Sequence, residues 1–101
     1  MAKRAVDNFT LDRLRSVPVL ICLNTMGAYV KVDQDYVPTT AKTTVRVHVN
    51  VAGHDWELLV DGLKFYDTQA KIGGGGSVDL VMHLWGVPFK KAVRMLIEAD
   101  A

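Results

Sequence analysis

Valine occupies every odd-numbered position of residues 44–51, and this alternation constrains the fold more than any other feature of the sequence. Because successive side chains of a strand point to opposite faces of a sheet, the valines share one face, and Arg46, His48 and Asn50 share the other. Apolar residues on one face only are typical of an antiparallel sheet with one buried face. The pattern therefore predicts a strand with an apolar inner face and a polar outer face.

Other short segments indicate that this strand belongs to a meander. Residues 53–55 are expected to turn the chain, and Asp61-Gly62 is a strong hairpin signal. A polar turn and then a loop at residues 38–40 are expected after the strand candidate at residues 29–32. The remaining strand candidates are residues 29–32, 56–60 and 63–67.

The segment before the sheet has helical spacing. Residues 8–26 are interpreted as one or two helices, with Thr10 as an N-cap and Gly27 as a left-handed C-terminal cap. Residues 17–23 are also compatible with a buried strand, because they form a short run that includes β-branched residues. The helical interpretation is the preferred one.

The C-terminal third is predicted to be helical after a glycine-rich break. Residues 71–76 are expected to interrupt regular structure, and Ser77 is expected to cap a helix that ends at Gly86. Pro88 then begins a last helix with apolar residues at helical spacing. The predicted fold is α+β: an N-terminal helix, an antiparallel sheet of three to five strands, and a C-terminal helical pair that covers one face.

Length and composition limit the range of functions. A chain of 101 residues with 50% hydrophobic residues predicts a single domain over residues 1–101. The net charge of +1 excludes a polycationic nucleic-acid binder, although residues 1–50 carry seven Lys and Arg against four Asp and Glu. No apolar run is long enough to span a membrane. With one cysteine and no secretory signal in the sequence, we expect a cytoplasmic location.

The C-terminal sequence resembles a known family. Residues 64–67 form an aromatic strand, residues 73–82 read Gly-Gly-Gly-Gly-Ser-Val-Asp-Leu-Val-Met, and residues 86–96 read Gly-Val-Pro-Phe-Lys-Lys-Ala-Val-Arg-Met-Leu. Their order and spacing resemble the second half of the zinc-binding domain of bacterial DnaG-type primases and related plasmid and phage replication proteins. The resemblance covers roughly residues 56–99, and the first half of the chain agrees only loosely.

The sequence differs from the family in the residues that hold the metal. The family holds zinc with cysteines and a histidine in and before the glycine turn, whereas this chain has Asp67, Thr68 and Gln69 there. The side chains of suitable type have no recognisable zinc-site spacing; they are Cys22, His48, His54 and His83. We therefore expect no metal and no cofactor, in a relative that has lost its zinc.

The resemblance implies a non-catalytic accessory protein for DNA replication or priming of a bacterial mobile element. Its expected partners are single-stranded DNA and a primase, polymerase or helicase subunit, and no membrane. The alternative is a protein-binding adaptor or regulator without nucleic-acid contact, which requires an exposed apolar patch, here sought around Trp85, Val87 and Met95.

Candidate residues for binding single strands are aromatic and basic, because bases stack on aromatic rings beside a basic groove. Strand alternation places Lys64 and Tyr66 on one face and Phe65 on the other. Both a binding role and a core or solvated role remain open for several of them. The candidates are Arg46, His48, Trp56, Lys64, Tyr66 and Lys71.

Other chemistry has little support in the sequence. The glycine run is compatible with a flexible connector or with phosphate contact, but it lacks the Lys-Ser/Thr ending of a P-loop. Asp79 and His83 are four residues apart on one predicted helix face, without an evident third partner. We expect Cys22 to be an inert buried thiol. No catalytic residue is predicted.

Overall fold

A computed structural model, which describes residues 8–38 and 42–99, contains four helices and five strands and confirms the α+β class. The expected loop at residues 38–40 falls mostly outside the described residues. In chain order the elements are α1 (Asn8–Arg15), α2 (Val19–Thr25), β1 (Tyr29–Val32), β2 (Val45–Val51), β3 (His54–Asp61), β4 (Lys64–Asp67), β5 (Ile72–Gly75), α3 (Gly76–Trp85) and α4 (Phe89–Glu98).

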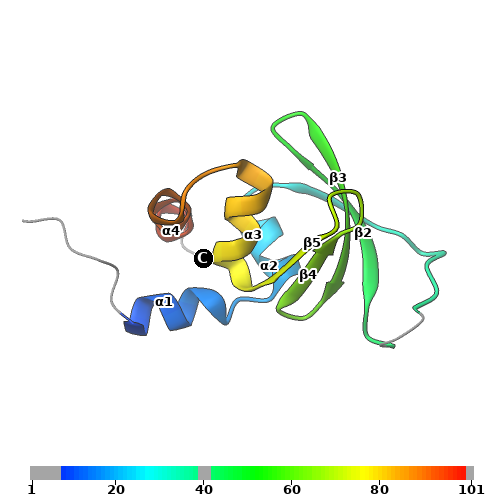
Figure 1. The fold of residues 1–101 in the computed structure, drawn as a ribbon, viewed down its shortest axis with the longest axis horizontal. Helices are drawn as coiled ribbons and strands as arrows, with labels where there is room; N and C mark the ends of the chain where they lie inside the picture. Colours follow the sequence, from blue (N-terminus) through cyan, green and yellow to red (C-terminus); the bar gives the residue numbers. More distant parts are fainter. Residues whose placement is uncertain (1–7, 39–41, 100–101) are drawn as a thin grey trace, which may run out of the picture.

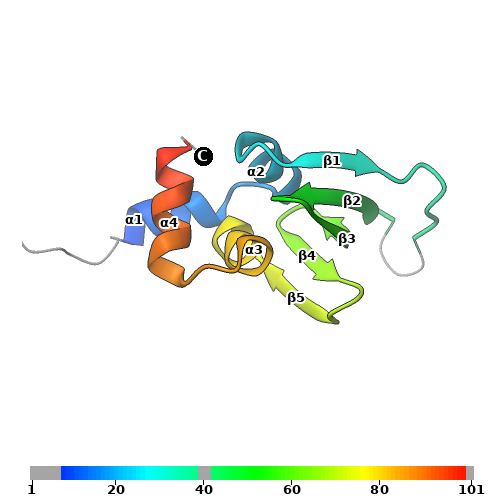
Figure 2. The same ribbon diagram turned by 90° about the horizontal axis from the view of Figure 1, so that it is seen from above.

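The strands form one antiparallel meander in the order β1-β2-β3-β4-β5 (Figures 1 and 2). The predicted valine strand is confirmed as β2, with Val47, Val49 and Val51 buried on the inner face. Arg46 pairs with Leu59 of β3, and Leu59 pairs with Tyr66 of β4. These three side chains therefore form one row across the outer face of the sheet.

The helices lie on the inner side of the sheet, where α2 contacts β1 and β3, and α3 contacts β5. The last helix, α4, packs against α3 and α1, on the side of α3 away from the strands (Figure 1). The core is therefore closed mainly by α2 and α3, whereas we expected the C-terminal pair to cover one face. Among its fully buried side chains are Leu14, Cys22, Leu58, Val81 and Leu96.

The N-terminal region is helical in two pieces, and the strand alternative for residues 17–23 is wrong. Gly27 has a φ of +80°, which confirms the left-handed cap after α2. Thr10 lies inside α1 and does not cap it. An N-cap preference is worth only about 1 kcal/mol, so the packing of a helix readily overrides it.

The predicted break at residues 71–76 is wrong, because Ile72–Gly75 forms β5 and pairs with β4. Glycine has a low strand propensity, but it is suited to this strand because the strand passes close to another side chain. A Cβ on Gly74 would lie 2.9 Å from two ring carbons of Phe65. The strand can thus approach the buried Phe65 ring only because Gly74 has no side chain.

The start of α3 also differs from the prediction. Gly75 occupies the N-cap position, and Ser77 is the second residue of the helix. Ser77 is buried, and its hydroxyl donates to the carbonyl oxygen of Leu14 in α1. A long-range hydrogen bond has therefore taken the place of the expected local cap, while Gly86, with a φ of +66°, ends the helix as predicted.

Two hairpin turns organise the centre of the sheet. The expected hairpin at Asp61-Gly62 is confirmed. The preceding turn consists of Ala52 and Gly53, both with positive φ, as a type I′ hairpin requires. His54 is consequently the first residue of β3 and pairs with Val51, so the prediction of a turn over residues 53–55 is wrong by its last two residues.

Candidate nucleic-acid interface

The outer face of the sheet brings together two of the predicted residues. Lys64 and Tyr66 are both exposed on β4, while Phe65 between them is buried, as the alternation predicted. Tyr66 is 40% exposed. Its neighbour on β5 is Gly73, at which a Cβ would lie 3.3 Å from the Tyr66 ring. Since Gly73 has no side chain, it leaves that edge of the Tyr66 ring uncovered.

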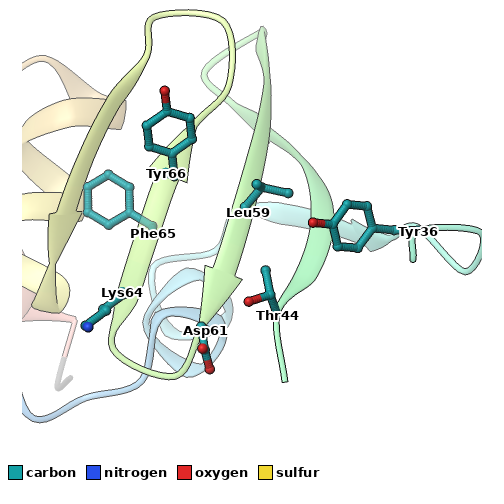
Figure 3. A pocket seen from close by; sticks show the side chains of 7 residues that line it. All are labelled: Tyr36, Thr44, Leu59, Asp61, Lys64, Phe65 and Tyr66. Carbon is teal, nitrogen blue, oxygen red and sulfur yellow. The ribbon is translucent and has the colours of Figure 1, made fainter. Parts of the chain in front are cut away.

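A shallow hollow of about 230 Å³ lies over this part of the outer face (Figure 3). Leu59 lies between the two tyrosines Tyr36 and Tyr66, and Asp61 and Lys64 lie near one end of the hollow. The lining residues are Tyr36, Thr44, Leu59, Asp61, Lys64, Phe65 and Tyr66. The combination of aromatic walls with charged groups at one end suits a planar, polar-edged ligand.

Arg46 lies on the same face but is already paired. Its Nε is 2.9 Å from Asp33 Oδ2, its Nη2 also donates to that oxygen, and Glu57 Oε2 is 3.9 Å away. The guanidinium lies 5.1 Å from the centre of the Tyr36 ring. The hydrogen bond from Arg46 lowers the pKa of the Asp33 carboxyl. Arg46 therefore positions Tyr36 and presents little free positive charge.

His48 occupies the next row, between Lys31 of β1 and Glu57 of β3. Its Nε2 is 3.7 Å from Asp33 Oδ2, so it shares a carboxylate with Arg46. Lys31, Tyr36 and Leu59 also lie at this face but are not among the site residues predicted from the sequence. Strand alternation places Lys31 and Leu59 on the outer face, so both could have been predicted. Tyr36 lies in a loop, where this alternation does not apply.

Two predicted residues lie elsewhere. Trp56 is on the inner face of β3, with its ring 5.3 Å from that of His83, and its buried Nε1 has no hydrogen-bond partner among the described residues. It does not join the outer face, because it has the same strand parity as the buried Leu58. Lys71 is exposed in the β4–β5 turn, at the opposite end of the hairpin from Lys64.

A buried contact that sequence reasoning missed joins β4 to α3. Asp67 is 2% exposed, and its Oδ2 lies 2.7 Å from His83 Nε2. Its Oδ1 accepts hydrogen bonds from the backbone N–H groups of Gln69 and Ala70. Burial acts to raise the pKa of Asp67, but these hydrogen bonds outweigh it and lower the pKa below 3.8. Asp67 thus shapes the β4–β5 turn and ties it to α3.

Asp79 and His83, four residues apart in α3, do not bond to each other. Asp79 accepts a hydrogen bond from the N–H of Gly75 at 3.3 Å, while His83 is bonded to Asp67. Both side chains line a second open hollow of about 400 Å³ beside β5.

Zinc, which the family resemblance implies, does not fit the side chains present. Cys22 is fully buried in α2, and burial raises the pKa of its thiol to about 11, which disfavours the thiolate that zinc needs. His48 and His83 lie on opposite sides of the sheet. Within residues 8–38 and 42–99, no three His, Cys, Asp or Glu side chains form a group that could hold a metal ion.

The apolar patch that the adaptor alternative requires, sought around Trp85, Val87 and Met95, is only partly exposed. All three side chains are partly buried and pack against the core. Other apolar side chains are more exposed, including Phe9 of α1 at 80% and Ile97 of α4 at 47%. None of the described helices is long and apolar enough to cross a membrane.

Comparison with known proteins shows a similarity to one segment of a longer protein. The chain is 32% identical over 87 residues to a protein of Zymomonas mobilis described as a 65 kDa protein. That alignment covers 86% of this chain but only 13% of the length of the relative. No known protein family matches the chain, and no solved structure matches it.

Proposed function

We propose that the outer face of β2–β4 binds single-stranded DNA, and that the protein is a non-catalytic accessory factor in replication or priming of a bacterial mobile element. The observation that carries the proposal is the placement of Tyr66 and Lys64 beside one hollow. An exposed aromatic ring next to a free cation is the arrangement that stacks a base and attracts its phosphate.

The charges on this face support weak binding. Within the described part of the chain, Lys31 and Lys64 form no ion pair, whereas Arg46 does. A few free lysines provide a few phosphate contacts, so affinity should depend modestly on salt. Stacking of one base on Tyr66 would contribute about 1–3 kcal/mol. The proposed interface is therefore small and suited to a role beside a larger enzyme.

The replication context rests on the resemblance of residues 56–99 to primase zinc-binding domains. In this proposal the chain is a zinc-less member of that group, and the hydrogen bonds of Asp67 hold the turn that precedes the glycine strand. The similar segment of the Zymomonas mobilis protein occupies a small part of a longer chain. That arrangement is compatible with a module that acts beside a primase, polymerase or helicase.

Fluorescence anisotropy of a labelled single-stranded oligonucleotide tests the proposal. We expect binding that weakens between about 50 and 200 mM salt, with Lys64→Ala reducing the slope by about one unit. Tyr66→Ala should weaken binding by about tenfold, because it removes the stacking ring. Phe9→Ala on α1 and Lys90→Ala on α4 are matched controls, since both residues are exposed and lie on helices rather than on the outer face of the sheet.

Absence of binding at high protein concentration would reject direct DNA recognition. In that case the exposed apolar residues of α1 and α4, Phe9 and Ile97, favour the alternative function of a protein-binding adaptor. Equal effects of Tyr66→Ala and Phe9→Ala would show that binding does not use the hollow.

A further inference from the structure

The polar end of the hollow carries an acceptor and a donor side by side. Asp61 and Lys64 are cross-strand partners on β3 and β4, and both line the hollow. They form no ion pair with each other in the described chain, and Figure 3 shows the Lys64 side chain directed away from Asp61. Neither charge is therefore neutralised by the other, and the flexible Lys64 side chain can turn toward a ligand in the hollow.

Asp61 is fixed in position but retains acceptor capacity. Thr43 Oγ1 donates to its Oδ1 at 2.8 Å, which orients the carboxylate. An ionised carboxylate has about four acceptor sites on its two oxygens, so one hydrogen bond leaves it able to accept two more. An anionic acceptor beside aromatic side chains suits a base rather than a phosphate, because a phosphate would be repelled from it.

We propose that this hollow is a subsite for a single guanine base of the bound strand, an inference that rests on the proposed function. The volume of about 230 Å³ is below the range of about 300–1,000 Å³ that holds drug-sized ligands, so it suits one base. Guanine presents two adjacent N–H donors, which a carboxylate accepts as a pair. Its O6 carbonyl, next to those donors, accepts from Lys64.

The other bases match this end of the hollow less well. Thymine presents one N–H between two carbonyl oxygens, and these oxygens would face the Asp61 carboxylate. Adenine and cytosine each present one amino donor beside a ring acceptor, so they can give Asp61 only one hydrogen bond. The expected order is therefore guanine first and thymine last.

The test uses oligothymidylates of about 12 nucleotides in which the central base is thymine, guanine or hypoxanthine. Affinities are measured by anisotropy with the unmodified protein, with Asp61→Asn, and with Asp55→Asn as the control. Asp55 is an exposed carboxylate on the same strand that accepts from Asn50 and does not line the hollow. Thermal unfolding verifies that each variant is folded.

We expect one guanine to raise affinity about tenfold over thymine, and hypoxanthine, which lacks the 2-amino group, to lose much of that gain. Asp61→Asn should abolish the preference while leaving the affinity for the all-thymine strand at least as high. Equal affinity for all strands, or a guanine preference that persists in Asp61→Asn, would overturn the guanine subsite but leave single-strand binding intact. Failure of every strand to bind would instead reject the proposed function.

Discussion

His83 of α3 and Asp67 of β4 form a hydrogen bond of 2.7 Å that links the helical layer to the turn between the last two strands. The residues are 16 positions apart, and Asp67 is almost completely buried. Because the same carboxylate accepts two backbone N–H groups of the turn, this contact ties the turn that leads into β5 to α3.

Removing the Asp67 carboxylate should therefore destabilise the fold. We expect Asp67→Ala to lower the free energy of unfolding by about 2 kcal/mol, since it leaves His83 and two turn N–H groups without their acceptor. Urea unfolding followed by circular dichroism measures the loss. Asp79→Ala is the control, because Asp79 is exposed and accepts one long hydrogen bond. An equal loss in both variants would contradict the role assigned to Asp67.

Stability should also fall in acid. The pKa of Asp67 in the folded protein lies below its ordinary 3.8, so the ionised form is favoured by folding. This contribution is fully present above the unfolded value and is lost as the pH falls through the folded pKa. Urea midpoints between about pH 5 and 2 should drop more steeply for the unmodified protein than for Asp67→Asn. Parallel curves would argue against this linkage.

The glycine strand offers a test of close packing. Gly74→Ala should cost about 1–3 kcal/mol, because the new methyl group would meet the buried Phe65 ring at 2.9 Å. Gly75→Ala is the matched control, since its nearest contact would be at 3.9 Å. Thermal unfolding compares the two variants, and a Gly74→Ala protein as stable as its neighbour would show that β5 can move away from Phe65.

Arg46 gives a prediction about binding. Asp33 holds its guanidinium, so Arg46→Ala should weaken DNA binding less than Lys64→Ala does. Asp33→Asn, by contrast, should strengthen binding severalfold, because it frees a cation and removes an anion on the same face. Anisotropy titrations at one salt concentration compare the three variants. Weaker binding by Asp33→Asn would mean that the position of Tyr36 matters more than charge.

Cys22 should be unreactive in the folded protein. Its side chain is fully buried, and the pKa of the thiol is raised to about 11, so the nucleophilic thiolate is scarce at neutral pH. A thiol reagent such as Ellman's reagent should label it only at the rate at which the protein opens. Rapid labelling under native conditions would contradict the buried placement.

Features encoded locally were predictable from the sequence. The alternation of residues 44–51, the Asp61-Gly62 turn and the opposite orientations of Phe65 and Tyr66 follow from strand geometry and turn chemistry. The inward orientation of Trp56 follows from the same rule, because Trp56 has the same strand parity as the buried Leu58.

Features that depend on distant neighbours were not predictable. The glycine strand β5 pairs with β4 so close to the Phe65 ring that Gly74 has no room for a side chain, which no local propensity reveals. The pairing of Arg46 with Asp33, 13 residues away, and of His83 with Asp67 depends on how the elements pack. Charge counting therefore overestimated the free positive charge on the outer face.

The central claim is that single-stranded DNA binds on the outer face of the sheet. Backbone amide chemical-shift mapping by NMR during titration with an unlabelled single-stranded oligonucleotide tests it most directly. We predict that the largest shift changes occur at Arg46, Leu59 and Tyr66 and at their strand neighbours, with little change in α1 and α4. Changes concentrated in α1 and α4, or no changes at about millimolar oligonucleotide, a concentration that reaches even weak non-specific binding, would contradict the account.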